Sequence, residues 1–302
     1  MLIEIILAVF LGILFGTITG LLPGIHINLI GAIVVSLLSF LLKITSPIIL
    51  VIFIVSMAIT QTFVDFIPSI FLGAPDEDTV LSILPGHELL KQGKGYEAIV
   101  LTSYGSLAAI FLILLISPIF IFFLPKVENI IKILIPYLLI ISSIFLITKE
   151  KYKITALIVF LLSGFLGIAV LSSNLKDPFL PLLSGLFGSS SLIISIKSKT
   201  IIQKQILTKP KINKREFISP LIASLFSAPL TSFLPGLGSG QAAVLGSSFK
   251  KLTQRQFLIL LGATNTIVLG LSFIVLYSIG RKRTGMAVAV ETILQEITLN
   301  QV

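Results

Sequence analysis

Two short segments place a Pro-Gly pair inside an otherwise apolar run and follow it with small or polar residues. The first reads GLLPGIHINLIGA from Gly20, and the second reads SFLPGLGSGQAAV from Ser232. Proline removes a backbone donor and glycine adds conformational freedom, so a helix is expected to stop or bend at each pair. If a new helix starts after the break, its first N–H groups and its positive dipole end attract an anion. The candidate substrate-binding residues are therefore Pro23, Gly24, His26 and Asn28 in the first segment, and Pro235, Gly236, Gly238, Ser239 and Gln241 in the second.

A second polar pattern also occurs twice. AITQTFVDF at 58–66 resembles GATNTIVLG at 262–270, and farther along the chain Thr79 falls near Thr284. Asp65 lies within an apolar run, where a carboxylate is costly and usually functional. Beside Gln61 and Thr62 it suits a proton carrier or a Na+ ligand, and the residue types do not decide between H+ and Na+. The candidate ion-coupling residues are Thr60, Gln61, Thr62 and Asp65 in the first copy, and Thr264, Asn265 and Thr266 in the second.

The composition indicates the kind of scaffold that holds these residues. The chain of 302 residues is 55% hydrophobic, above the ~45–50% of ordinary globular domains. Residues 101–124 contain no charged side chain, which is long enough for the roughly 20 apolar residues that cross a bilayer. We therefore predict an all-α polytopic membrane protein. The candidate spans are 2–22, 27–42, 47–72, 97–124, 131–147, 154–172, 180–196, 218–234, 240–249 and 257–280.

The net charge of +9 comes from basic residues that concentrate between the apolar spans. Membrane orientation explains this better than nucleic-acid binding, because cytoplasmic loops carry an excess of Lys and Arg. Seven basic residues lie between 197 and 215, so loop 197–217 is expected to be cytoplasmic. The triplet Arg281-Lys282-Arg283 then falls outside, against the trend.

This orientation makes the two Pro-Gly units inverted copies, one entering from each side of the membrane. Inverted repeats with Gly/Pro-interrupted segments in matching places point to the midplane binding site of a secondary transporter. We expect a single transmembrane domain, 1–302, with inverted structural repeats whose Pro-Gly-broken helices form re-entrant hairpins. Its parts are repeat 1 at 1–99, connecting spans and the basic loop at 100–217, and repeat 2 at 218–302.

Other function classes receive little support. The chain has no cysteine, which excludes disulfides, Fe–S clusters and cysteine nucleophiles. Its two histidines lie far apart in the sequence and do not form a zinc site, and only Asp65 is embedded where an aspartyl protease needs two aspartates. Asp76, Glu77 and Asp78 sit at an expected helix start, where capping is a simpler role than metal binding. We expect no cofactor, no metal and no enzyme activity, with an intramembrane enzyme as a remote alternative.

These segments, together with PSIFLGAPDEDTVLSILPGHELLKQGKGYEAI at 68–99, resemble the large membrane subunit, TctA, of tripartite tricarboxylate transporters. The resemblance implies a permease driven by an ion gradient, which works with a small membrane subunit and an extracytoplasmic binding protein. It maps the family's two substrate loops onto Pro23, Gly24 and Asn28 and onto Pro235, Gly236 and Gly238. This chain has Ile25-His26-Ile27 where the family usually has a Gly-Leu-Gly-like sequence, so tricarboxylate specificity is not implied. Family chains continue with further spans, so repeat 2 is expected to be shortened.

The sequence therefore predicts a multi-pass protein of the cell membrane that carries a small organic anion, a carboxylate in the first instance, together with Na+ or H+. A flippase of a lipid-linked phosphate is the alternative, because broken helices and basic loops also suit a phosphate headgroup. A membrane scaffold is a further alternative, and it predicts no ligand-dependent change in stability. The expected partners are the anionic substrate, the lipid bilayer and the two protein subunits, and no nucleic acid.

Overall fold

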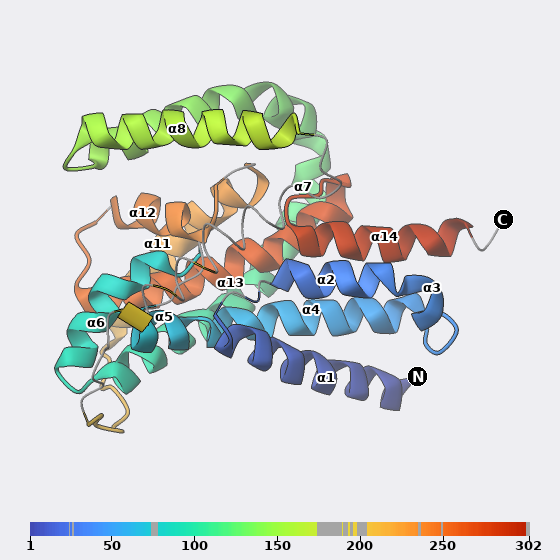
Figure 1. Cartoon of the computed structure of the whole chain (residues 1–302), viewed down its shortest axis with the longest axis horizontal. Coiled ribbons are helices and arrows are strands. Elements are labelled where there is room, and N and C mark those ends of the chain that lie inside the picture. The colour runs from blue at the N-terminus through green and yellow to red at the C-terminus, as the bar shows by residue number, and fades with distance from the viewer. Residues whose placement is uncertain are drawn as a thin grey trace.

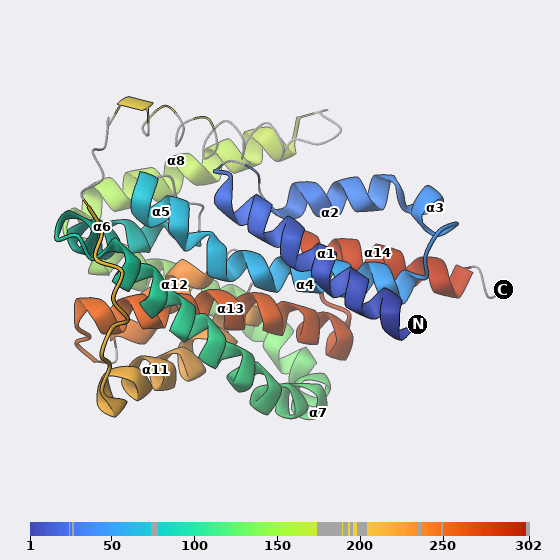
Figure 2. The ribbon, with the colours of Figure 1, turned by 90° about the horizontal axis from the view of Figure 1, so that it is seen from below.

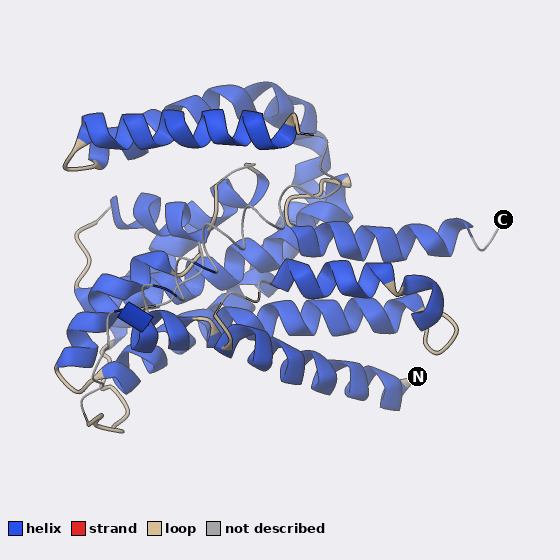
Figure 3. Cartoon of the chain, viewed as in Figure 1, coloured by secondary structure: helices blue, strands red, loops and turns tan. Residues whose placement is uncertain are grey.

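The structure, a computed structural model, consists of helices joined by loops, with no strand in the part that it describes (Figure 3). Five helices within this part are long and apolar enough to cross a membrane. These two findings confirm the prediction of an all-α polytopic membrane protein. The described residues are 1–23, 25, 27–73, 78–173, 189, 193, 196–197, 204–234, 237–248 and 250–299. Most of the predicted span 180–196 lies outside them, as do Gly24, His26, Pro235 and Gly236.

The first two helices form a hairpin. Helix α1 (Leu2–Leu21) begins at the right of Figure 1 and ends near the middle of the molecule, where α2 (Ile27–Ser36) begins and runs back to the right. The short α3 (Leu38–Leu41) completes the predicted span 27–42. Helix α4 (Pro47–Val64) then returns along α1. The break between α1 and α2 falls at the first Pro-Gly pair, as the sequence predicts.

Helices α1 and α4 approach closely because α1 carries a glycine at every fourth position. A Cβ added to Gly12 would lie 2.6 Å from the Cβ of Ser56, and one added to Gly20 would lie 2.8 Å from the Cβ of Val64. A Cβ on Gly16 would overlap the carbonyl oxygen of Met57. Small residues spaced in this way let two membrane helices bring their backbones into contact.

The predicted span 47–72 is present, but it is broken at Asp65 into α4 and α5 (Phe66–Leu72). Pro68 is the physical cause, because it has no N–H to donate to the carbonyl oxygen of Val64 four residues earlier. At the same break, the Ser69 hydroxyl donates to the carbonyl oxygen of Asp65 over 2.9 Å. Helix α5 ends at Gly73, whose φ of 65° is the left-handed conformation that glycine adopts readily. The break places the Asp65 side chain at a helix junction.

A short 3-10 helix, η1 (Val80–Ser82), and α6 (Ile83–Lys91) lead into the longest helix, α7 (Gly95–Lys149). Its first part runs past α13, and its last part bends back alongside α8 (Lys153–Leu171), as Figures 1 and 2 show. The prediction of two spans joined by a loop is therefore wrong for residues 125–130, which belong to α7.

Prolines explain the shape of α7. The helix contains Pro118, Pro125 and Pro136, and each removes one backbone hydrogen bond and bends the helix without ending it. The returning part packs Ile135 against Leu234 and Leu237, which flank the second Pro-Gly pair. Its neighbour α8 buries no residue of its span.

The second half of the chain also begins with a hairpin, which approaches from the opposite end. Helices α11 (Lys214–Phe233) and α12 (Ser239–Ser248) extend from the left of Figure 1 toward the middle and back. Helix α13 (Gln254–Ile279) then crosses the molecule from left to right, and α14 (Gly285–Leu299) starts near the middle and lies beside α2. The sequence did not predict α14 as a packed helix.

Helix α13 forms the centre of the core. Its side chains are buried from Leu258 to Val268, and it packs against α7 and α11. A Cβ on Gly262 would overlap the carbonyl oxygen of Thr102, so the backbones of α13 and α7 are in contact. At the start of α13, Arg255 bridges Glu97 of α7 at 2.9 Å and Glu216 of α11 at 3.4 Å. These contacts hold the three helices together at one end of the molecule.

Candidate functional site

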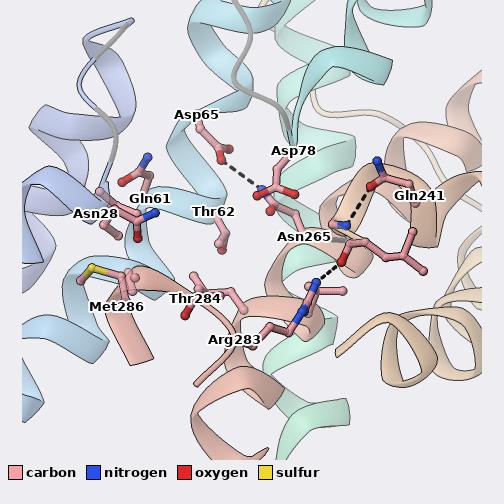
Figure 4. Close-up of a pocket in the computed structure, with 17 residues that line it drawn as sticks. Asn28, Gln61, Thr62, Asp65, Asp78, Gln241, Asn265, Arg283, Thr284 and Met286 are labelled. Atoms are coloured by element: carbon pink, nitrogen blue, oxygen red, sulfur yellow. Dashed lines mark hydrogen bonds between the residues drawn. The ribbon is translucent and has the colours of Figure 1, made fainter. Parts of the chain in front are cut away.

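A cavity of about 350 Å³ lies where the two hairpins meet α4, α13 and the segment before α14 (Figure 4). It brings together residues that are distant in the sequence, because in each hairpin the first helix ends and the second helix begins near the middle of the molecule. The predicted residues that line it are Asn28, Gln61, Thr62, Asp65, Gly238, Gln241 and Asn265. Three polar lining residues were not predicted, namely Asp78, Arg283 and Thr284.

The carboxylate at the break of α4 and α5 faces the amide of the second motif copy. The Asn265 side-chain nitrogen donates to Asp65 Oδ2 over 3.0 Å, and the two side chains are 4% and 8% exposed. One helical turn before Asp65, Gln61 Oε1 accepts a 3.1 Å hydrogen bond from the Thr19 hydroxyl of α1. The Asp65 carboxylate is therefore buried and held in place by hydrogen bonding.

Three of the predicted ion-coupling residues, Thr60, Thr264 and Thr266, do not line the cavity. The Thr60 hydroxyl donates to the carbonyl oxygen of Ser56 over 2.8 Å, and its side chain lies against Gly16 of α1. The Thr264 hydroxyl, fully buried, donates to carbonyl oxygens of its own helix. Successive helical residues point about 100° apart, so only part of each motif can face the cavity. Thr266 contacts the cavity lining indirectly, through Thr62.

The start of α12 is capped from the other half of the chain. Asp78 Oδ1 accepts hydrogen bonds from the Ser239 backbone N–H at 2.9 Å and from the Ser239 hydroxyl at 2.7 Å. The Gly238 N–H donates to Gln241 Oε1 at 2.8 Å. The prediction that Asp78 caps its own helix is therefore wrong, because its carboxylate binds α12 instead. Asp76 and Glu77 lie outside the described residues.

Arg283 brings a positive charge into the cavity. Its guanidinium donates to the carbonyl oxygen of Leu237, just before α12 (Figure 4). In the first hairpin, Asn28 near the start of α2 lies against Gly285, because a Cβ on Gly285 would be 2.6 Å from Asn28 Cγ. The segment after α13 thus meets both hairpins, and the second hairpin also meets the segment after α5 through Asp78.

The two halves repeat one further detail. The Thr79 hydroxyl lies 2.6 Å from the hydroxyl of Ser69 on α5, and the Thr284 hydroxyl lies 3.4 Å from that of Ser272 on α13. The similarity of Thr79 and Thr284 was visible in the sequence. The residues immediately before these threonines, Asp78 and Arg283, could have been found from the same alignment.

The formal charges of the lining residues are unequal. Two carboxylates, Asp65 and Asp78, face one guanidinium, Arg283, which gives 1 − 2 = −1. Like charges about 4 Å apart repel by about 4 kcal/mol at an effective dielectric constant near 20. An anion that entered alone would therefore meet a net negative cavity. No group of three or more His, Asp or Glu side chains suited to a metal ion occurs in the described part of the chain.

Comparison with known proteins gives two matches. The model of the tripartite tricarboxylate transporter TctA family matches residues 6–301. An uncharacterized protein from Methanocaldococcus jannaschii is 34% identical over 309 residues, which cover 98% of this chain and 74% of that protein. No solved structure matches.

Proposed function

This chain belongs to the tripartite tricarboxylate transporter TctA family, and we propose that it is an ion-coupled secondary permease for a small organic anion. The family consists of transporter membrane components and not of enzymes, which confirms the transport prediction at that level. The apolar helices and the family together make it a multi-pass membrane protein. The observation that carries the finer proposal is the polar cavity in which the two hairpins meet.

The substrate is a small carboxylate that binds in this cavity. About 350 Å³ is within the size range of small-molecule sites. Arg283 supplies a positive charge, the first turn of α12 supplies N–H groups and a positive dipole end, and Asn28 adds an amide. Together these groups favour an oxygen-rich anion over an apolar ligand.

The coupling ion is a cation bound at Asp65. Gln61, Thr62 and Asn265 line the same cavity as this carboxylate. Their side chains carry oxygens of the kind that suits Na+, while the carboxylate alone suits H+. The cavity has a formal charge of −1 before substrate enters. A bound dicarboxylate would make the total formal charge −3. Entry of one or more cations together with the dicarboxylate therefore lowers the electrostatic cost of binding.

The opposed directions of the α1–α2 and α11–α12 hairpins support the proposal of inverted repeats over 1–99 and 218–302. In transporters with such repeats, alternating access arises when one repeat rocks against the other around a central site. On this arrangement we retain the proposal that loop 197–217 is cytoplasmic. Family members work with a small membrane subunit and a binding protein, and we propose the same two partners for this chain.

The test is thermal unfolding of the detergent-purified protein with succinate, citrate, phosphate or polyprenyl phosphate, each with and without Na+ and at two pH values. A ligand that binds the native state raises its apparent stability. We expect a carboxylate-induced increase that requires Na+ or low pH and that disappears in Asp65→Asn. Thr60→Val, which alters a side chain outside the cavity, should retain the increase.

Other outcomes would contradict the proposal. An increase with polyprenyl phosphate alone would favour a lipid flippase, and no increase with any ligand would favour a scaffold. A carboxylate effect that is independent of both Na+ and pH would remove the ion-coupled part of the proposal.

A further inference from the structure

The start of α12 lacks a cap of its own. Gly238 occupies the N-cap position, because its carbonyl oxygen accepts the 3.2 Å hydrogen bond from the Ala242 N–H that opens the helix. Gln241, three residues later, bonds back to the Gly238 N–H, which is one half of a capping box. The other half requires a side-chain oxygen at position 238, and glycine has none.

Asp78, 161 residues away, supplies a capping oxygen from outside the helix, which accepts from the N–H of Ser239, the first residue of α12. A Cβ on Gly238 would lie 2.9 Å from Asp78 Oδ1, so the absence of a side chain there leaves room for the incoming carboxylate. The Ser239 side chain, only 1% exposed, adds a second donor to the same oxygen. The local structure is therefore shaped to receive a carboxylate that does not belong to the helix.

This carboxylate also lies in the transport cavity. Asp78, Gly238 and Gln241 all line it, together with Arg283 on the adjacent segment. Ser239 does not itself line the cavity, and its N–H and hydroxyl are bonded to Asp78, which does line it, so a substrate carboxylate reaches these two donors only by replacing Asp78. Both carboxylates carry the same charge and the same acceptor oxygens, so one can replace the other without a loss of hydrogen bonds.

We propose that Asp78 is a tethered carboxylate. It holds the α12 end of the cavity when substrate is absent, and a substrate carboxylate displaces it. The proposal rests on the proposed function. It attributes the specificity of the cavity for carboxylates to the exchange of the Asp78 carboxylate for that of the substrate. The exchange also breaks the contact between the segment after α5 and α12, which joins the two halves of the chain. Binding of substrate thereby releases a link that the empty cavity maintains.

Competition of this kind has a measurable effect. A ligand that binds only the fraction of molecules in which its site is open has an apparent affinity lowered by that fraction. Removal of the Asp78 carboxylate therefore strengthens substrate binding, whereas removal of an ordinary binding residue weakens it. An N-cap interaction corresponds to about a fivefold to thirtyfold change in an equilibrium constant, and we expect a gain in succinate affinity within that range.

The experiment compares wild type, Asp78→Ala and Asp78→Asn by thermal unfolding and by succinate titration in the presence of Na+ or at low pH. Asp78→Ala should unfold at a lower temperature, regain stability with acetate, and bind succinate more tightly than wild type. Asp78→Asn keeps the shape and one acceptor oxygen, so its affinity for succinate should lie between the two. It also serves if the alanine variant does not fold.

The control is Asn213→Ala, which removes the 2.8 Å side-chain cap from the start of α11 outside the cavity. This variant should lose stability without rescue by acetate and without a change in succinate affinity. If wild type binds succinate but Asp78→Ala and Asp78→Asn bind it more weakly, the exchange proposal is overturned and the proposed function stands. If wild type and both Asp78 variants bind no carboxylate under any condition, the proposed function fails as well.

Discussion

The hydroxyl oxygens of Thr62 and Thr266 lie 2.8 Å apart, although 204 residues separate them in the chain. They are the third residues of the two Thr-Gln/Asn-Thr motifs, so equivalent positions of the two halves contact each other. In a two-fold arrangement only residues near the axis contact their own counterparts. This contact therefore supports the proposed pairing of the halves, whose centre would lie at the crossing of α4 and α13.

The Thr62–Thr266 contact should contribute to stability. Either hydroxyl can donate in this contact, and Thr62 also lies 2.8 Å from the carbonyl oxygen of Ile59. Thr266→Val keeps the shape and removes one partner of this hydrogen bond, and we expect a loss of about 1 kcal/mol in the free energy of unfolding. Denaturant titration in detergent measures the loss. Thr60→Val, whose hydroxyl bonds only its own helix, should cost less, and an equal cost would contradict the special role of the pair.

Asn265 should set the affinity for the coupling ion. Its amide donates to Asp65 Oδ2 over 3.0 Å, and hydrogen bonds to charged groups contribute about 1.5–3 kcal/mol. In Asn265→Ala the Asp65 carboxylate is held less firmly and one oxygen ligand is lost, so the cation concentration at half effect should rise about tenfold or more. The readout is a titration of the succinate-induced thermal shift with Na+ or with protons. An unchanged midpoint for both ions would count against a cation site at Asp65.

Arg283 should be required for the anion. Arg283→Met changes the formal charge of the cavity lining from −1 to −2 and removes the donor to the Leu237 carbonyl. We expect at least a tenfold loss of succinate affinity, measured by isothermal titration. Lys282→Met is the matched control, because Lys282 pairs with Glu291 at 2.5 Å and does not line the cavity. Equal losses in the two variants would mean that overall charge, rather than Arg283 itself, governs binding.

Gly262 should tolerate no side chain. Even one methyl group would overlap the Thr102 carbonyl oxygen and force α13 away from α7, and overpacking of this kind costs about 1–3 kcal/mol. Gly262→Ala should therefore unfold at a clearly lower temperature. Gly164→Ala on α8 has no atom within 4 Å of the new methyl group and should be neutral or slightly stabilising, because alanine favours a helix over glycine. A comparable loss at both positions would argue against close packing as the cause.

Local patterns in the sequence were sufficient for much of this structure. Apolar runs predicted the long helices apart from the continuity of α7, the Pro-Gly pairs lie between the two helices of each hairpin, and the repeated motifs predicted Gln61, Thr62, Asp65 and Asn265 of the cavity. The glycines at 12, 16 and 20 were equally visible and would have predicted the packing of α1 on α4.

What could not be predicted depends on partners that are distant in the chain. Asp78 looks like the cap of its own helix because Ser239 is 161 residues away. Arg283 looks like an exposed orientation signal, yet it enters the cavity because the segment before α14 turns back to the middle of the molecule. Residues 125–130 contain Pro, Lys and Glu and resemble a loop, but α7 passes through them as a bent helix.

The short second helices of the two hairpins have an electrical consequence. Helices α2 and α12 have ten residues each, about 15 Å at 1.5 Å per residue, which is half of a hydrocarbon core about 30 Å thick. We expect a cation that reaches the cavity from one side to cross about half of the transmembrane voltage. At 100 mV this corresponds to about 1.2 kcal/mol per charge, half of the roughly 2.3 kcal/mol for a full crossing. Cation binding would then be electrogenic by itself. The membrane potential would therefore change the cation occupancy of the substrate-free carrier before any substrate moves.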